Sequence, residues 1–436
     1  MTNQKWMNIR EILHQKKIDS TVHVRGWIYR TRSSGNIVFI VLRDVTGILQ
    51  ATVKKGNLPD AGFKDAEKAL IESSVQVEGT VKEDKRAPGG YELLVTGFHV
   101  VQFADPFPIV KDQSPEFLLD QRHLWIRSQK LSSVLKIRST VVGAIHSFFR
   151  EHGFFEFDAP VLQPNQCEGG STLFEVKYYE NKTYLSQSWQ LYAEAAVFSL
   201  EKLYNMGPTF RAERSKTSRH LSEFWMAEME AAWMDLHDVS ELAKEEVKYI
   251  LNKVLSENVY ELQVLKQDVE KLRRIVSSDF PTITYTEALQ ILNEKEHLDV
   301  EWGKDLRTVE EDALMKHFQT PVVVTNYPLA IMAFYKPPDP KDPKTALCFD
   351  MLAPDGYGEI VGGSQRSLDI EQMKQRLQDM GEKVENYDWY FDLRRYGSVP
   401  HAGYGLGVER LVAWVCGLDN IKDAIPFPRT LLRYKP

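Results

Sequence analysis

Residues 208–233, PTFRAERSKTSRHLSEFWMAEMEAAW, form the stretch that decides the fold of this chain. An apolar run ends at Phe210 and a second begins at Phe224, so the pattern predicts two strands joined by a polar loop. Five basic side chains crowd this loop within ten residues: Arg211, Arg214, Lys216, Arg219 and His220. Cations this close repel one another unless an anion lies among them, and arginine forks match phosphate oxygens. The loop is therefore either a polyphosphate site or a solvated turn, and the other segments have to decide between the two.

The composition is that of a globular protein with a large core. The chain has 436 residues, which predicts two or three domains, and 43% of them are hydrophobic. The start, MTNQKWMNIREILHQKK, lacks the apolar segment of a signal peptide, and no run approaches the roughly 18 apolar residues of a membrane span. Three widely spaced cysteines indicate a reducing compartment without disulfides or zinc. We therefore expect a cytoplasmic protein with no membrane partner.

The N-terminal quarter differs from the remainder in charge and in pattern. Residues 1–104 hold 15 Lys and Arg against 11 Asp and Glu, whereas the whole chain has a net charge of −7. Five strand-like runs follow from Val22, with a helix-like piece at residues 63–73, an order that suits a five-stranded barrel of the OB type. Such barrels bind single-stranded nucleic acid by aromatic stacking and basic side chains. One face could carry Arg25, Arg30, Arg32, Phe39 and Gln50, although Phe39 could equally belong to the core.

Prolines mark the boundary after this quarter. Two of them in residues 104–108 and a third at Pro115 indicate a stiff linker, so we expect a barrel domain at 1–104, a linker at 105–130 and a larger domain at 131–436. Pro160 interrupts a strand-like run, which points to a strand edge and a subunit contact. Residues 236–318 are interpreted as a helical insertion without chemistry, and residues 321–328 and 330–336 as strands.

Two further motifs suggest ligand chemistry. Asp350 and Glu359 flank a turn at Asp355, and such a carboxylate pair beside a polyphosphate would suit Mg²⁺, although acidic residues beside turns are common. GYGLGVER, residues 403–410, is a glycine-rich strand running into a helix with Arg410 near its start. Its G-x-G-x-G spacing is not the G-x-G-x-x-G of dinucleotide-binding turns, so the glycines more plausibly admit a ligand or another backbone, and the helix start favours an anion.

In this order, the strand with Pro160, FRAE with RHLSEF, and GYGLGVER resemble the class II aminoacyl-tRNA synthetases. The barrel points to the aspartate, asparagine and lysine subgroup. Within it, SQSWQLYAE, RHLSEFWMAEMEAAW, GEIVGGSQR and DLRRYGSVPHAGYGLGVERL look like the asparagine enzymes, and the resemblance covers essentially the whole chain. It implies an α+β protein, in which an N-terminal OB-fold barrel precedes a class II catalytic domain with an antiparallel sheet of six or seven strands flanked by helices, in a homodimer. The implied reaction uses ATP to convert L-asparagine to asparaginyl-adenylate and then charges tRNA(Asn).

The same resemblance assigns the ATP site. Arg211 is expected to stabilise the reacting α-phosphate, and Arg410 to be catalytic with it, by positioning and charge rather than by a protein nucleophile. Phe224 is expected to stack on adenine, and Asp350 with Glu359 to carry Mg²⁺. The implied ATP-binding residues come from two motifs: Arg211, Glu213, Arg219, His220, Leu221, Phe224, Glu359 and Arg410.

The asparagine site and the anticodon site are assigned in the same way. The implied amino-acid-binding residues are polar: Glu168, Ser188, Gln190, Glu228 and Arg366. Aspartate enzymes place a lysine three residues after the glutamine of the QL pair, where this chain has Ala193, and Glu228 would accept from an amide and repel aspartate. In the barrel, Phe39 is expected to stack on the central anticodon uridine, with polar contacts from Arg30, Arg32 and Gln50.

Some positions depart from the pattern, and alternatives stay open. Trp189 stands where many relatives have a small residue, Ser218 replaces an arginine common in TRRHL, and Met332 with Lys336 lies in a segment that more often reads IKAFYM. One alternative is an aspartate-activating paralogue, although those that make asparagine lack the barrel. Another is a non-catalytic tRNA-binding or amino-acid-sensing relative, which would be expected to lose Arg211, Glu359 or Arg410.

Overall fold

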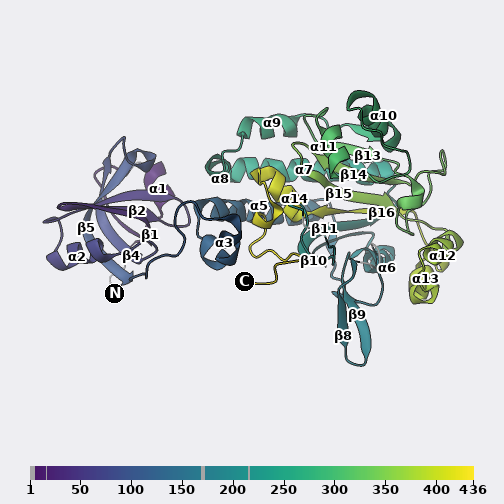
Figure 1. Cartoon of the computed structure of the whole chain (residues 1–436), viewed down its shortest axis with the longest axis horizontal. Coiled ribbons are helices and arrows are strands. Elements are labelled where there is room, and N and C mark those ends of the chain that lie inside the picture. The colour runs from purple at the N-terminus through teal and green to yellow at the C-terminus, as the bar shows by residue number, and fades with distance from the viewer. Residues whose placement is uncertain (1–4, 16, 168–171, 215–216) are drawn as a thin grey trace. The chain divides into compact units, whose positions relative to one another are not determined.

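The structure is a computed structural model that describes residues 5–15, 17–167, 172–214 and 217–436. It divides into two compact units, Met1–Leu118 and Leu119–Pro436 (Figure 1).

The first unit is a closed five-stranded barrel, as predicted. Its strands are hydrogen-bonded in the order β1-β2-β3-β5-β4, with β3 and β5 parallel and the other pairs antiparallel. Alternate residues of β2 are buried, so Val38, Ile40 and Leu42 point into the core while Phe39 lies on the outer face. The elements are α1 (Ile9–His14), β1 (Thr21–Ser34), β2 (Ile37–Arg43), β3 (Ile48–Lys54), α2 (Asp60–Lys68), β4 (Ser74–Glu83), η1 (Pro88–Gly90) and β5 (Tyr91–Gln102).

The second unit is built on an eight-stranded sheet in the order β12-β13-β14-β15-β16-β11-β10-β6. The strands are β6 (Phe155–Glu156), β10 (Lys202–Phe210), β11 (Glu223–Ala232), β12 (Thr282–Thr284), β13 (Val322–Thr325), β14 (Cys348–Ala353), β15 (Gly358–Gln365) and β16 (His401–Gly407). The expectation of six or seven antiparallel strands is wrong in detail. The inner pairs are antiparallel, but the short outermost strands β6 and β12 each pair in parallel with their neighbours.

The hairpin predicted from residues 208–233 lies toward the β6 edge of this sheet, with β10 beside the edge strand. Strands β10 and β11 pair from Lys202 opposite Ala231 to Phe210 opposite Glu223, and the basic loop joins them. Strand β11 then pairs with the glycine-rich strand β16, which pairs in turn with β15. The three segments that carry the sequence motifs are therefore neighbours.

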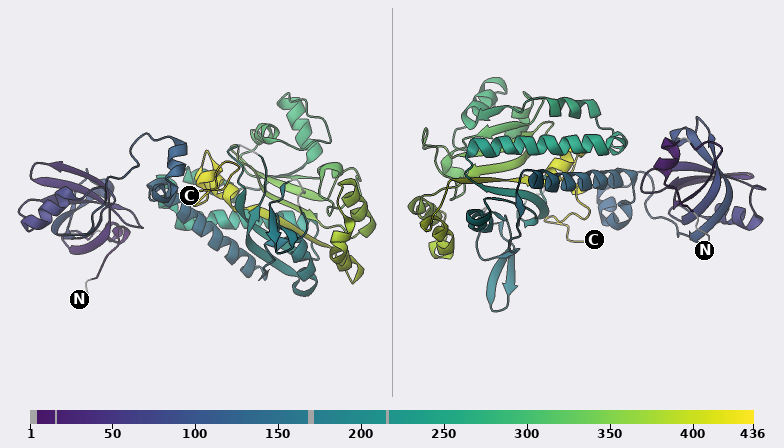
Figure 2. Two further views of the ribbon diagram at one scale, coloured as in Figure 1. Left: turned by 60° about the horizontal axis from the view of Figure 1, so that its bottom comes forward. Right: turned by 180° about the vertical axis from the view of Figure 1, so that it is seen from behind.

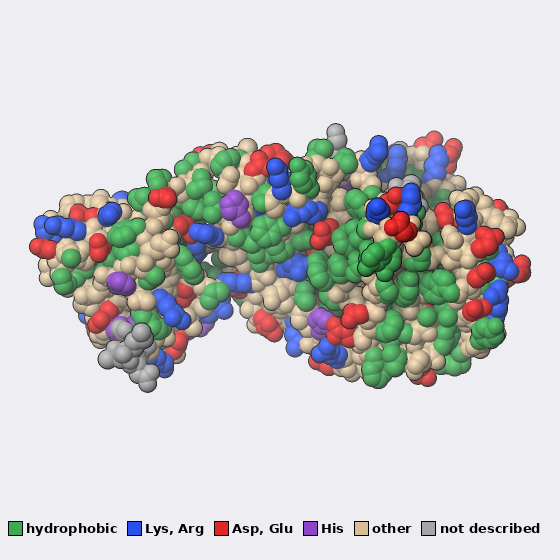
Figure 3. Space-filling view, turned by 90° about the horizontal axis from the view of Figure 1, so that it is seen from below, with side chains coloured by type: hydrophobic (Ala, Val, Ile, Leu, Met, Phe, Trp, Pro, Cys, Tyr) green, Lys and Arg blue, Asp and Glu red, His purple; other side chains and the backbone are tan. Residues whose placement is uncertain are grey.

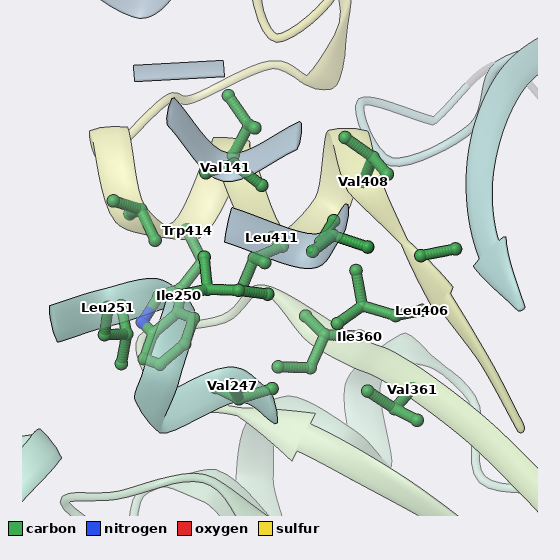
Figure 4. Close-up of a cluster of buried hydrophobic side chains, with 14 of the residues drawn as sticks. Val141, Val247, Ile250, Leu251, Ile360, Val361, Leu406, Val408, Leu411 and Trp414 are labelled. Atoms are coloured by element: carbon green, nitrogen blue, oxygen red, sulfur yellow. The ribbon is translucent and has the colours of Figure 1, made fainter. Parts of the chain in front are cut away.

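Three helices pack their apolar faces on the sheet and form the main core. Helices α5 (Gln129–Glu151), α7 (Leu236–Glu257) and α14 (Val408–Cys416) pack there, and α5 and α7 run side by side (Figure 2). Figure 4 shows the junction, where Ile250 of α7 and Leu411 of α14 face Ile360 of β15. Because α7 lies against the central strands, it is part of the core rather than a separate lobe.

The other elements surround this core. The remaining helices are α3 (Pro115–Asp120), α4 (Arg122–Trp125), α6 (Gln190–Leu200), α8 (Val259–Val264), α9 (Val269–Ser277), α10 (Tyr285–Lys295), α11 (Thr308–Met315), α12 (Ile370–Asp379), α13 (Asp388–Arg395), and the 3₁₀ helices η3 (Leu329–Ile331), η4 (Val384–Tyr387) and η5 (Ile421–Asp423). A small sheet has the order β7 (Leu162–Gln163), β9 (Asn181–Leu185), β8 (Glu175–Tyr178). Residues 330–336, expected as a strand, begin in η3 and continue as irregular chain. Their wrong assignment has a physical cause, because Arg376 of α12 takes the carbonyl groups that a strand would give to its neighbour.

Candidate active site

A first cavity opens at the end of the β10–β11 hairpin, beside the N-terminus of α14. Its lining comes from the basic loop, from β11, β15 and β16, and from the first turn of α14. All eight residues assigned to ATP by the resemblance line it: Arg211, Glu213, Arg219, His220, Leu221, Phe224, Glu359 and Arg410. The fold therefore brings the basic loop and the GYGLGVER motif, which are far apart in the sequence, to the same cavity.

The two arginines expected to be catalytic are held differently. Arg410 donates from Nη1 to the backbone oxygen of Glu359 at 2.7 Å and to its carboxylate at 3.2 Å. Arg211 has its guanidinium carbon 5.4 Å from the ring centroid of Phe224, and its buried Nε makes no hydrogen bond with any described residue. Arg211 also forms no ion pair within the described ranges, so its charge is available to a ligand.

Arg219 is anchored by acidic residues that the sequence analysis missed. Its Nη2 donates to both carboxylate oxygens of Asp312 at 2.7 and 2.9 Å, and its Nη1 lies 3.7 Å from Glu311. Burial and the charge of Glu359 raise the pKa of Glu311 to about 7. Part of residues 236–318 therefore reaches the candidate site, which the sequence analysis did not anticipate. The contact has no local sequence signal, because Asp312 is 93 residues from Arg219 and looks like an ordinary acidic residue in a helix.

His220 completes the basic side of the first cavity. Its Nδ1 contacts the hydroxyl of Thr217, and its Nε2 lies 3.4 Å from the carboxylate of Glu213. Burial lowers the pKa of His220, and the three nearby arginines lower it further, against the opposing effect of Glu213. The imidazole is therefore mostly neutral at pH 7, and it can donate one hydrogen bond and accept another.

A second cavity adjoins the first, and the two share Arg211, Met226, Glu359 and Gly405. Four of the residues assigned to asparagine line the second cavity: Ser188, Gln190, Glu228 and Arg366. The fifth, Glu168, lies outside the described residues. The lining of the second cavity also includes Asp305, Tyr335 and Lys336, which the sequence analysis assigned to no ligand.

Arg366 is fixed by a carboxylate behind the second cavity. Its Nε lies 2.9 Å from Oε1 of Glu230 and its Nη2 2.7 Å from Oε2, while Nη1 donates to Ser364 Oγ at 2.7 Å. Burial opposes the charged form, but Glu230 outweighs it and raises the pKa of Arg366 above its usual value. The guanidinium is thus neutralised and oriented before any substrate arrives.

Glu228 and Gln190 are also held by neighbours. Glu228 accepts from the hydroxyl of Ser188 and from the backbone N–H of Trp189 at 3.0 Å. Gln190 donates from Nε2 to Glu194 at 2.9 Å. The indole N–H of Trp189 donates to the carbonyl of Phe157 at 2.6 Å, so its side chain is tied to the region before Pro160.

A buried network stands behind Gln190. Glu194 is completely buried and accepts from the hydroxyl of Tyr390 and the guanidinium of Arg394, and its Oε2 lies 3.0 Å from His401 Nε2. Burial would raise the pKa of Glu194, but Arg394 and His401 outweigh it and lower the pKa. The network keeps one carboxylate ionised inside the protein and fixes α6 against α13 and β16.

Asp350 and Glu359 converge over Gly362. A Cβ at Gly362 would lie 2.7 Å from Glu359 Oε1 and 3.4 Å from Asp350 Oδ1. Burial first, and then the charge of Glu359, raise the pKa of Asp350 well above its usual range, and Lys336 opposes this only in part. Two close carboxylates with this little compensation could hold a hard divalent cation such as Mg²⁺.

Glycines of β16 form part of the floor. A Cβ at Gly403 would lie 2.2 Å from Glu230 Oε2 and 2.8 Å from Arg366 Nη2, and one at Gly405 would lie 2.2 Å from Met226 Cε. At Gly403 the Cβ would also lie 2.3 Å from the backbone oxygen of Met229, so no side chain fits there, whereas at Gly405 it would meet the flexible end of Met226.

The barrel presents the four residues assigned to the anticodon on one outer face. Arg32 pairs with Phe39 across β1 and β2, and Gln50 pairs with Val41 across β2 and β3. The guanidinium carbon of Arg32 lies 5.3 Å from the ring centroid of Phe39, and Arg30 is exposed two residues earlier on the same strand. The alternative that Phe39 belongs to the barrel core is therefore wrong.

Comparison with known proteins identifies the family. Residues 114–431 match the model of the class II tRNA synthetases (D, K and N), and residues 22–101 match the OB-fold nucleic acid binding domain. The chain belongs to the class II tRNA synthetases of this group.

The most informative relatives act on asparagine. An asparagine–tRNA ligase of Thermoplasma acidophilum is 45% identical over 99% of this chain and 100% of its own length, and one of Thermococcus kodakarensis is 48% identical over 95% and 96%. The crystal structure of asparaginyl-tRNA synthetase from Pyrococcus horikoshii, complexed with asparaginyl-adenylate, has a TM-score of 0.94 at 45% identity and covers both chains completely. The corresponding complex from Entamoeba histolytica has a TM-score of 0.86 at 29% identity, over 96% of this chain and 97% of its own.

Proposed function

We propose that this enzyme activates L-asparagine with ATP and transfers the asparaginyl group to the 3′ end of tRNA(Asn). The observation that carries the proposal is that Arg211 lines both cavities at once. One cavity is rich in arginine, which suits a triphosphate, and the other is lined by paired polar groups, which suit an amino acid. The near full-length relatives that are asparagine–tRNA ligases support the same reaction.

In the first step, a carboxylate oxygen of asparagine attacks the α-phosphorus of ATP. A new P–O bond forms, the bond to the bridging oxygen breaks, and pyrophosphate leaves with the electron pair. Arg211, between the cavities, stabilises the charge on the α-phosphate, while Arg219, His220 and Arg410 hold the leaving pyrophosphate. Phe224 and Glu213 receive the adenine. No protein nucleophile is required.

Mg²⁺ would be held by Asp350 and Glu359, whose oxygens converge over Gly362. When bound, the ion would offset phosphate charge and bring these carboxylates and the triphosphate together.

The second cavity favours asparagine over aspartate by charge. Glu228 accepts hydrogen bonds and would receive the amide N–H₂ of asparagine, whereas it would repel a second carboxylate. Arg366 would reach the side-chain carbonyl oxygen, but its charge is already offset by Glu230. Ala193 is buried and leaves no additional cation at the position where aspartate enzymes carry a lysine.

In the second step, a hydroxyl of the terminal adenosine of the tRNA attacks the carbonyl carbon of the adenylate, and AMP leaves. The outer face of the barrel, with Phe39, Arg30, Arg32 and Gln50, would bind the anticodon by stacking and polar contacts.

A homodimer is supported by apolar side chains near the β6 edge of the sheet. Phe155 is 56% exposed and Trp233 64%, and Leu162 lies just beyond Pro160. Figure 3 shows hydrophobic side chains gathered on one face of the larger unit. No helix among the described residues has both the length and the apolar character to cross a membrane. The three cysteines are free, which agrees with a cytoplasmic location.

The test is amino-acid-dependent exchange between ATP and pyrophosphate, followed by charging of tRNA(Asn). We expect exchange with asparagine and far less with aspartate. Equal exchange with aspartate would contradict the specificity, and no exchange with either would contradict the catalytic assignment.

A further inference from the structure

One wall of the second cavity is formed by a segment that is not part of any strand of the sheet. Residues 329–336 begin in η3 and continue as irregular chain, and they contribute Ile331, Met332, Ala333, Tyr335 and Lys336 to the cavity lining. Tyr335 places its ring centroid 5.3 Å from the guanidinium carbon of Arg366. The position of this segment therefore sets the shape of the cavity on the side of Arg366.

An arginine outside the cavity binds three carbonyl groups of the segment, which is also fixed by backbone bonds from Ser367 N–H to the carbonyl of Tyr335 at 2.7 Å and from Leu329 N–H to that of Lys344 at 2.8 Å. Arg376 of α12 donates from Nη2 to the carbonyl oxygens of Leu329 at 2.8 Å and Met332 at 2.5 Å, and from Nη1 to that of Lys336 at 3.1 Å. These carbonyls mark the beginning, the middle and the end of the segment. Arg376 itself lines none of the cavities described here.

The surroundings of Arg376 indicate a role beyond simple packing. Met373 and Leu377 lie on the same face of α12 and are fully buried against Phe334 and Tyr335. Within the described ranges Arg376 forms no ion pair, and burial lowers its pKa, with Asp379 opposing only in part. An apolar side chain would continue this buried face at a lower desolvation cost. The arginine thus serves the three carbonyl groups rather than the apolar contact.

We infer that Arg376 is a positioning residue that sets the affinity for the amino acid through residues 329–336. The inference rests on the proposed assignment of the second cavity to asparagine. Without the guanidinium, the carbonyl groups of Leu329, Met332 and Lys336 lose a donor, so Met332 and Lys336 are held less firmly at the cavity wall, whereas the Ser367 N–H still holds Tyr335. The first cavity contains no residue of the segment, so ATP binding would be spared.

Two substitutions and one control test this role. Arg376→Met keeps the apolar stem and removes every donor, whereas Arg376→Lys keeps the charge but cannot reach three carbonyls from one ammonium group. Gln378→Ala is the control, because Gln378 is exposed on the same helix and makes no side-chain hydrogen bond with the described residues.

The measurement is steady-state ATP–pyrophosphate exchange at varied asparagine and at varied ATP, with thermal unfolding of each variant. For Arg376→Met we expect the KM for asparagine to rise about 10- to 100-fold, the range that a small displacement of binding groups can cause. The KM of Arg376→Met for ATP should stay within about twofold of the wild type. Both KM values of Gln378→Ala should also stay within about twofold. The KM of Arg376→Lys for asparagine should lie between those of the wild type and Arg376→Met.

Three results would overturn the inference: unchanged KM values in a folded Arg376→Met protein, an equal rise for ATP and asparagine, or a lowered unfolding temperature with unchanged KM values. Failure of the proposed function looks different, because the wild type would then prefer another amino acid. The KM for that amino acid would then test Arg376 in the same way.

Discussion

The two cavities that share Arg211 are built by opposite rules. In the first, Arg211 has no carboxylate partner among the described residues, and the basic loop concentrates positive charge. In the second, Arg366 is matched beforehand by Glu230. A phosphate is thus met by one arginine kept available for it, whereas an uncharged amide is met by an arginine whose charge is already balanced. The comparison predicts that charge removal will be most damaging in the first cavity.

The largest effect is expected for Arg211→Ala. This change removes the cation that lies between the cavities, and exchange should fall about 1,000-fold or more, as when a transition-state donor is lost. Thermal unfolding and tRNA binding should be nearly unchanged. Arg214→Ala is the matched control, since Arg214 is exposed in the same loop and lines neither cavity. Loss of activity in both variants would contradict the special role of Arg211 between the two cavities.

A smaller effect is expected for Glu228→Gln in the second cavity. The glutamine oxygen can still accept from Ser188, but the negative charge that excludes aspartate is gone. We expect kcat/KM for asparagine to fall about 10- to 100-fold and the preference over aspartate to narrow. The measurement is exchange with each amino acid, and Glu223→Gln on the same strand serves as the control. An unchanged preference would show that charge does not select asparagine here.

The last prediction concerns stability rather than activity, and it expects the smallest effect on exchange. Tyr404, which lines the second cavity, donates to the fully buried Glu246 of α7 at 2.7 Å, and burial raises the pKa of Glu246 from 4.5 to about 8. The folded protein thus binds a proton that the unfolded chain releases between these values, so stability falls as pH rises from 4.5 to 8.

The contribution is about 1.4 kcal/mol per pH unit within that window. Thermal unfolding at pH 5 to 8 should show a shallower pH dependence for Glu246→Gln than for the wild type. Glu245→Gln, at the exposed neighbouring position, should follow the wild type. Parallel curves for all three proteins would rule out this role of Glu246.

The first cavity could be predicted because its residues are close together in the chain. Arg211, Arg219 and Phe224 occupy one hairpin, which strand periodicity and basic loop composition predict, although the resemblance was needed to choose a phosphate site over a solvated turn. Arg410 required the resemblance, since a glycine-rich strand before a helix has several interpretations. The barrel could also be predicted, because the alternating burial in β2 follows directly from the alternation in its sequence.

The second cavity could be anticipated only in part. Glu230 was visible as a carboxylate on a strand, but its partner Arg366 is 136 residues away, and no local pattern joins them. Asp305 lies in an irregular segment whose composition resembles any solvated loop, and Lys336 ends an apolar run. Residues 330–336 were assigned to a strand because their apolar content suits one, whereas contacts from α12 decide their conformation.

The glycines of β16 have a consequence for engineering. Strand β16 can pass close to the Arg366–Glu230 pair because Gly403 has no side chain, and a methyl group there would lie 2.2 Å from Glu230 Oε2 and 2.8 Å from Arg366 Nη2. The absence of a side chain at Gly403 therefore leaves the space that the Arg366–Glu230 pair occupies. A Gly403→Ala change would displace the Arg366–Glu230 pair while removing no charge and no hydrogen-bonding group, so one added methyl group would be enough to disable the second cavity.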